Sequence, residues 1–126
     1  MENNRITLNF GSTTIDVTVR NTPTAQAILN ALPITSTVQT WGEEVYFSVP
    51  VEATLEHDAK DVVEAGEIAF WVEGSCIAIG FGPTPISQGN EIRLAAATNI
   101  WADADDDVRQ LINVSSQDRV LVDWAK

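Results

Sequence analysis

The stretch GEIAFWVEGSCIAIGF, residues 66–81, decides the fold class. Two apolar runs of strand length flank Gly74 and Ser75, a dipeptide that is typical of a tight hairpin turn. Because alternate positions such as Ala69 and Ala78 are apolar too, both faces of these strands are expected to be covered. A two-residue turn predicts the pairs Val72–Ile77, Phe70–Ile79 and Ile68–Phe81.

A second Gly-Ser dipeptide divides RITLNFGSTTIDVTV, residues 5–19. Apolar and polar residues alternate on both sides of Gly11 and Ser12, which is the pattern of half-buried strands. This arrangement predicts a hairpin whose apolar side chains share one face. The predicted pairs are Phe10–Thr13, Leu8–Ile15 and Ile6–Val17.

Further extended segments are predicted from the same alternation. They are residues 34–41, 43–56, 91–101 and 119–124. In the segment 43–56, Pro50 predicts an edge or a break because proline cannot donate to a ladder. The inward residues of that segment are Val45, Phe47, Val49 and Val51. The acidic stretch 52–67 is predicted as solvated loop and strand edge.

Two short helices are predicted. Residues 22–32 begin with Thr22, which suits an N-cap, and Pro23, which suits the first helical position. The apolar stripe of this helix is Ala25, Ile28, Leu29 and Leu32. A second helix is predicted after the acidic residues 103–107, because acidic side chains favour a helix start. Its apolar stripe is Val108, Leu111 and Ile112.

Together these elements predict a single domain, residues 1–126, that is mainly β with seven or eight strands and one or two short helices. Strands do not alternate with long helices, so a doubly wound α/β fold is not expected. A closed antiparallel barrel covered at one opening or face by the helix 22–32 accounts for the pattern and leaves no exposed strand edge. Trp71 and Trp124 are expected in the core or the barrel wall.

Four stretches in this order resemble a small prokaryotic family with a cyclophilin-like fold. They are WGEEVYFSVP (41–50), GEIAFWVEG (66–74), FGPTPIS (81–87) and EIRLAAATNI (91–100). The resemblance covers nearly the whole chain and implies a compact cyclophilin-like barrel. It implies no activity, because the family is largely of unknown function. The sequence lacks the QGGD-like and SQFF-like stretches of true prolyl isomerases, so no catalytic residue carries over.

Charge and composition limit the classes of partner that this protein is expected to bind. The formal net charge is −11 at pH 7, a value at which nucleic acid and anionic membranes are repelled. The expected partner is a small molecule or peptide, neutral or cationic. Cys76 lies in an apolar run, which predicts a buried, reduced thiol and a cytoplasmic protein. The first residues lack the layout of a signal peptide, and no apolar run reaches membrane-spanning length.

A ligand site is predicted where aromatic residues fall at strand ends beside the stiff loop GFGPTPIS, residues 80–87. Gly80 and Gly82 permit a close backbone approach or positive φ, and Pro83 and Pro85 fix φ, so the loop either plugs the barrel or forms one wall of a site. Acidic residues next to the aromatic ones favour an amine-bearing ligand. The predicted ligand-binding residues at the barrel mouth are Trp41, Glu43, Tyr46, Phe81, Pro83 and Trp101.

Two alternative functions stay open at this stage. A divergent peptidyl-prolyl isomerase would need a cationic donor near the imide, and Arg93 is the candidate. A protein–protein interaction module, including a homodimer, would need an apolar patch outside the pocket. No metal or cofactor is expected. The acidic run 103–107 lacks the Gly and Glu of a calcium loop, and His57 has no second ligand beside it.

Overall fold

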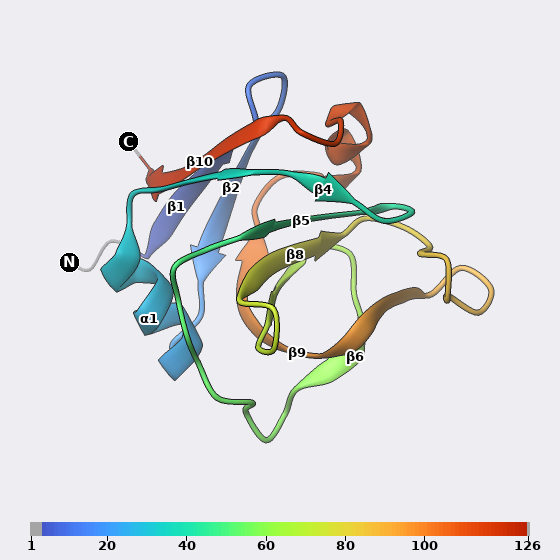
Figure 1. Ribbon diagram of the computed structural model, residues 1–126, viewed down its shortest axis with the longest axis horizontal. Helices are drawn as coiled ribbons and strands as arrows, with labels where there is room; N and C mark the ends of the chain where they lie inside the picture. The colour runs from blue at the N-terminus through green and yellow to red at the C-terminus, as the bar shows by residue number, and fades with distance from the viewer. Residues whose placement is uncertain (1–3, 126) are drawn as a thin grey trace.

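The computed structural model describes residues 4–125, which form ten strands, one α-helix and one 3₁₀ helix (Figure 1). The first half of the described chain contains β1 (Arg5–Asn9), β2 (Thr14–Val19), α1 (Pro23–Ala31), β3 (Ile34–Thr37), β4 (Gln39–Thr40) and β5 (Glu44–Ser48). The second half contains β6 (Lys60–Val63), β7 (Glu67–Trp71), β8 (Cys76–Gly80), β9 (Ile92–Ala104), η1 (Val108–Asn113) and β10 (Arg119–Trp124).

The strands form a nearly closed antiparallel barrel. Neighbouring strands follow the order β3-β10-β1-β2-β9-β7-β8-β5-β4, and β6 pairs with β9. The two ends of this path, β3 and β4, are consecutive parts of the segment 34–40, so the sheet returns to itself. The predicted mainly β, barrel-shaped fold is confirmed. It has more strands than expected, because the segment 34–41 is divided and because β6 lies in the stretch 52–67, which was predicted as solvated loop and strand edge.

The first hairpin has the predicted register. Leu8 lies opposite Ile15 and Ile6 opposite Val17, and the N–H of Phe10 donates to the carbonyl of Thr13 at 2.8 Å. These four paired aliphatic side chains are fully buried. The alternation of polar and apolar residues therefore assigned the faces of β1 and β2 correctly.

The register predicted for residues 66–81 is wrong by two residues. Phe70 lies opposite Ile77, not Ile79, because the turn spans four residues, 72–75, and its Ser75 N–H donates to the Val72 carbonyl at 3.4 Å. A slip of two residues leaves every side chain on the same face, so the apolar pattern does not distinguish the two registers. The expectation that both faces are covered is confirmed, since every residue of β8 is buried.

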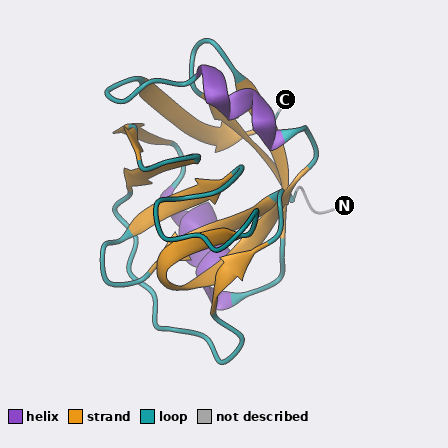
Figure 2. Ribbon diagram, turned by 90° about the vertical axis from the view of Figure 1, so that its right-hand side faces the viewer, coloured by secondary structure: helices purple, strands orange, loops and turns teal. Residues whose placement is uncertain are grey.

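Both helices lie where the sequence predicts them, on opposite sides of the barrel (Figures 1 and 2). Thr22 caps α1, and its hydroxyl accepts from the N–H of Ala25 at 3.1 Å. Asp107 caps η1, which is a 3₁₀ helix. Val108 and Leu111 are three residues apart and face the core, as the 3₁₀ period requires. Ile112 was predicted on the same stripe, but it is 68% exposed.

The barrel has a core on each side of its β7–β8 wall. The larger cluster fills the interior and includes Val45, Phe47, Phe70, Ile77 and Trp101. The smaller cluster lies on the outer face of the wall, beneath β6 and the first half of β9. Its buried members are Val63, Ala69, Ala78, Ile92, Leu94 and Ile100. The long strand β9 thus crosses the outside of the barrel before it joins the wall, and this crossing creates the site described next.

The tryptophans differ in burial. Trp71 and Trp124 lie in the barrel wall, as predicted, at the ends of β7 and β10, where Trp71 is partly buried and Trp124 is 40% exposed. Trp101, predicted at a pocket mouth, is the fully buried one, and its indole N–H donates to the Ala69 carbonyl at 3.3 Å.

Candidate functional site

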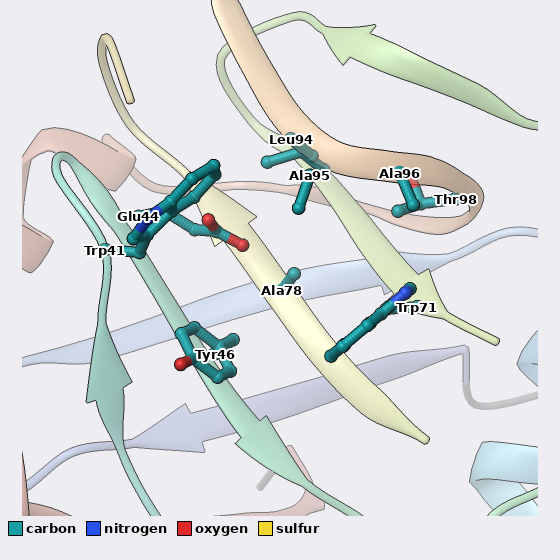
Figure 3. Close-up of a pocket in the computed structure, with 9 residues that line it drawn as sticks. All are labelled: Trp41, Glu44, Tyr46, Trp71, Ala78, Leu94, Ala95, Ala96 and Thr98. Atoms are coloured by element: carbon teal, nitrogen blue, oxygen red, sulfur yellow. The ribbon is translucent and has the colours of Figure 1, made fainter. Parts of the chain in front are cut away.

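A pocket of about 180 Å³ lies on the outer face of the barrel wall, between β5, β8, the end of β7 and the first half of β9 (Figure 3). It is an outer-surface pocket and not the opening of the barrel. Its lining residues are Trp41, Glu44, Tyr46, Trp71, Ala78, Leu94, Ala95, Ala96 and Thr98. A cavity of roughly 150 Å³ holds a benzene-sized molecule, so this pocket suits a small ligand or one side chain of a larger one.

The alternation of β5 places two of these side chains. Val45 and Phe47 point into the barrel and are buried there, so Glu44 and Tyr46 point to the outer face. Ala78 on β8 lies directly opposite Tyr46. Because Ala78 has only a methyl group, it leaves room above the wall, and the pocket occupies that room.

Glu44 is the chemically distinctive residue of the pocket. It is only 6% exposed, and its carboxylate makes no hydrogen bond or ion pair with any group of residues 4–125. Figure 3 shows the carboxylate turned toward the space between Trp41 and Ala78. Burial raises the pKa of Glu44 from 4.5 to about 7, because the charged form loses hydration that nothing in the protein replaces.

Aromatic rings form the walls on either side of this carboxylate. Trp41 precedes β5 and Tyr46 lies within it, while Trp71 enters from the end of β7 (Figure 3). The Trp71 ring lies directly against Gly74, where an added Cβ would be 2.3 Å from the indole. The absence of a side chain at Gly74 is therefore what lets this ring lie where it does.

The proline-rich loop holds two walls of the pocket together. The Thr84 hydroxyl donates to the Arg93 carbonyl on β9, next to the wall residue Leu94. The N–H of Glu43 donates to the Pro83 carbonyl at 3.0 Å, next to Glu44. The sequence left two roles open for this loop, to plug the barrel or to form one wall of a site, and these contacts support the second. Phe81, at the start of the loop, fills the barrel instead, because it is buried in the barrel core.

The structure brings together some of the predicted ligand-binding residues and separates others. Trp41 and Tyr46 line the pocket. Glu43 does not, since its side chain packs over Gly82, and Pro83 is exposed on the loop. Phe81 and Trp101 belong to the interior core.

Sequence reasoning missed Glu44 and Trp71. A signal for Glu44 was present: it is two residues from Tyr46 on an alternating strand, so the two must share a face, whereas Glu43 has the opposite parity. No comparable signal marked Trp71, because its place in the pocket depends on how β9 crosses the wall.

Arg93, the candidate donor for isomerase chemistry, is not among the residues that line the pocket. Its neighbour Leu94 lines the pocket, whereas Arg93 pairs with Val62 on β6. There it contacts the carboxylates of Glu91 and Asp61 at 2.5 and 3.0 Å. The hydrogen bond from Arg93 lowers the pKa of Glu91, so both partners stay charged at neutral pH.

The described residues include few groups suited to metal binding or nucleophilic chemistry. Among residues 4–125, no group of three or more His, Cys, Asp or Glu side chains is arranged to hold a metal ion. Cys76 is buried, its thiol donates to the Gly74 carbonyl at 3.3 Å, and burial raises its pKa. Within the described part of the chain, no helix is long and apolar enough to cross a membrane.

The barrel, its capping helices and its outer pocket define a small cyclophilin-like β-barrel protein. Residues 4–123 match the profile of the family described as Cyclophilin-like, and the chain belongs to this family. It is also similar to a hypothetical protein from Archaeoglobus fulgidus, known from a solution structure. The two chains are 38% identical with a TM-score of 0.83, and the match covers 96% of this chain and 94% of the other. No curated protein matches the sequence.

Proposed function

We propose that this protein binds a small, positively charged organic molecule, or a cationic side chain of a peptide, in the Glu44 pocket, and that it does so without prolyl isomerase chemistry. The observation that supports the proposal most strongly is the Glu44 carboxylate, which is buried and has no partner among the described residues. A buried carboxylate without a partner is costly, and a bound cation would compensate that cost.

The surroundings of Glu44 agree with a ligand that is partly apolar. Aromatic and aliphatic side chains make up most of the lining, while few polar groups fix an orientation. The formal net charge of −11 favours the approach of cations over anions. The reduced, buried Cys76 supports a cytoplasmic setting for this binding.

Binding without isomerisation is supported by the position of Arg93. An isomerase of this fold would need a cationic donor over the bound imide, but the Arg93 guanidinium is paired with Glu91 and Asp61 and does not line the pocket. An assay with a proline-containing test peptide should therefore show no acceleration above the uncatalysed rate. Acceleration that is lost in Arg93→Ala would contradict this part of the proposal.

The experiment that tests binding is a titration of the protein with simple aliphatic amines, followed by amide NMR shifts. Shifts should concentrate on residues around the pocket, such as Tyr46, Ala78 and Leu94. Glu44→Gln should weaken binding at least tenfold, while Glu43→Gln, which changes the neighbouring carboxylate outside the pocket, should not. Equal effects of the two substitutions would show that general surface charge attracts the amines.

The affinity should also depend on pH. A cation binds the ionised form of Glu44, whose pKa in the free protein is about 7. About one molecule in ten is ionised one unit below that pKa and nine in ten one unit above it, so the Kd should fall roughly tenfold from pH 6 to pH 8. Glu44→Gln should abolish this dependence, and a pH-independent Kd in the natural protein would contradict the role of Glu44.

A further inference from the structure

We infer that the pocket selects a methylated ammonium group, such as a trimethylammonium head, over a primary ammonium group. This inference rests on the proposed function, since it names the class of cation that the same pocket takes. The feature behind it is the combination of one buried carboxylate with three aromatic side chains in a pocket that has few hydrogen-bond acceptors (Figure 3).

The acceptors in the lining are too few for a primary ammonium. Such a group carries three N–H donors, each of which loses a water molecule on entering the pocket. Of the nine lining side chains, only Glu44, Tyr46 and Thr98 carry oxygen, and the Thr98 hydroxyl already donates to the Lys60 carbonyl at 2.9 Å. A trimethylammonium head has no N–H group, so it loses no hydrogen bond when it leaves water.

The aromatic side chains supply the interaction that such a head prefers. Trp41, Tyr46 and Trp71 come from three different segments and surround the pocket on two sides (Figure 3). The faces of tryptophan and tyrosine rings attract quaternary ammonium groups through their negative quadrupole, most strongly where water is excluded. The methyl groups of the ligand would contact the rings and Ala78, and the charge would lie near Glu44.

The carboxylate restricts what else the ligand can carry. An anionic group close to the ammonium, as in a betaine, would be repelled by Glu44 in its poorly solvated environment. The inferred ligand is therefore a cation with a neutral or extended remainder. A free small molecule and a trimethylated lysine side chain both have this chemistry.

The inference is tested with three alcohols that differ only in the head group: choline, ethanolamine and the uncharged 3,3-dimethylbutan-1-ol. Calorimetric or NMR titrations at pH 8 should give choline at least a tenfold lower Kd than ethanolamine. The uncharged alcohol, which has the same shape as choline, should bind at least tenfold more weakly than choline.

Each outcome has a defined meaning. If ethanolamine binds as tightly as choline, the preference for methylation is wrong while amine binding stands. If the uncharged alcohol binds as tightly as choline, the inference that the pocket selects a cation is wrong. If neither cation binds, the proposed function itself fails. Glu44→Gln and Trp71→Leu should both weaken choline binding, whereas the control variant Glu43→Gln should not.

A last comparison separates the two sources of the head group. A short peptide with one trimethylated lysine is titrated beside choline, with the unmodified peptide as control. A lower Kd for the modified peptide than for choline would assign the pocket to a protein side chain. An equal or higher Kd would assign it to a free small molecule. If the unmodified peptide binds as tightly as the modified one, the methylated-ammonium inference is wrong.

Discussion

Gly42 packs directly against Pro85: a Cβ on Gly42 would lie 2.8 Å from the Cδ atom of Pro85 and 2.9 Å from the Cα atom of Thr84. This contact joins the turn that carries Trp41 and Glu44 to the stiff loop that follows β8. Proline at position 85 fixes the loop, and the loop in turn leaves no space for a side chain at position 42. The rigidity of the loop thus limits the movement of one wall of the pocket.

The first prediction concerns this contact. Gly42→Ala should destabilise the protein by about 1–2 kcal/mol for the left-handed backbone, and by about 1–3 kcal/mol more for the collision with the loop. Gly89→Ala is the matched control, because Gly89 has φ +64°, close to the +61° of Gly42, but nothing within 4 Å of its added Cβ. Urea denaturation measures both losses, and equal losses would show that the loop yields freely.

The second prediction concerns Glu44 and pH. Its pKa is about 7 in the folded protein and near 4.5 when unfolded, so between these values the folded state holds a proton that the unfolded state has released. Stability from this group is therefore greatest below pH 4.5 and decreases as the pH rises to about 7. Glu44→Gln removes the decrease, so the variant should be more stable than the natural protein at pH 8 by up to about 3 kcal/mol.

Denaturation of both proteins at pH 4 and pH 8 measures this difference. The two should be of similar stability at pH 4, and Glu43→Gln should show no comparable gain at pH 8. A Glu44→Gln variant that gains nothing at the higher pH would mean that Glu44 is better solvated than its 6% exposure indicates.

The third prediction separates a core tryptophan from a pocket tryptophan. Trp101→Phe should lower stability by about 1–3 kcal/mol, because it shrinks a fully buried side chain and leaves the Ala69 carbonyl without its donor. It should not change choline affinity. Trp41→Phe, at a half-buried position in the pocket wall, should change stability little and should weaken choline binding.

Urea denaturation and a choline titration of both variants give this comparison. Loss of choline binding in Trp101→Phe at conditions where the variant is folded would contradict the placement of Trp101 in the interior core. An unchanged choline Kd in Trp41→Phe would contradict a role of the indole ring in the pocket wall, and an unchanged Kd in Trp41→Leu would contradict any pocket role of Trp41.

The fourth prediction concerns the ion pairs of Arg20. Its guanidinium donates to Asp103 at 2.7 Å and to Glu67 at 3.3 Å, and the hydrogen bond from Arg20 lowers the pKa of Asp103. A lowered carboxyl pKa adds stability above the unfolded pKa, and that stability is lost as the pH falls. Because Arg20 and Asp103 are both partly exposed, Arg20→Ala should cost only about 0.5–1 kcal/mol at pH 7.

The cost of Arg20→Ala should shrink at pH 3 and in high salt. Arg119→Ala serves as the control, because Arg119 is exposed and makes no ion pair with the described residues. Thermal unfolding at pH 3 and pH 7 measures both variants. A cost for Arg20→Ala that is independent of pH would assign the loss to the packing of the side chain and not to its charge.

Much of the barrel could be predicted from local patterns. Period-two alternation assigned the buried faces of β1, β2 and β5 correctly, and the Gly11–Ser12 turn identified the register of the first hairpin. Thr22 and Pro23 marked the start of α1 to the residue. These features depend on residues close in sequence, where turn and capping chemistry acts directly.

Part of the lining of the candidate pocket could be predicted from local patterns, and part could not. Trp41 was predicted from its place at a strand end and Tyr46 as an aromatic wall residue nearby, and Glu44 could have been, since strand parity puts it beside Tyr46. Trp71 could not, because its role in the pocket depends on β9 crossing the outer wall. That crossing brings together segments whose relation no local pattern encodes.

The same distinction explains the wrong register at residues 72–75. Alternation determines which side chains share a face, and it is unchanged when one strand slides by two residues against the next. The register Phe70–Ile77 goes with the four-residue turn 72–75, which the Gly74–Ser75 dipeptide did not predict, whereas the depth at which Glu44 is buried depends on the packing of several strands. Which residues form a strand, and which face of the strand each side chain takes, are local properties of the chain. Burial and the shifted pKa of Glu44 arise only when distant strands exclude water together.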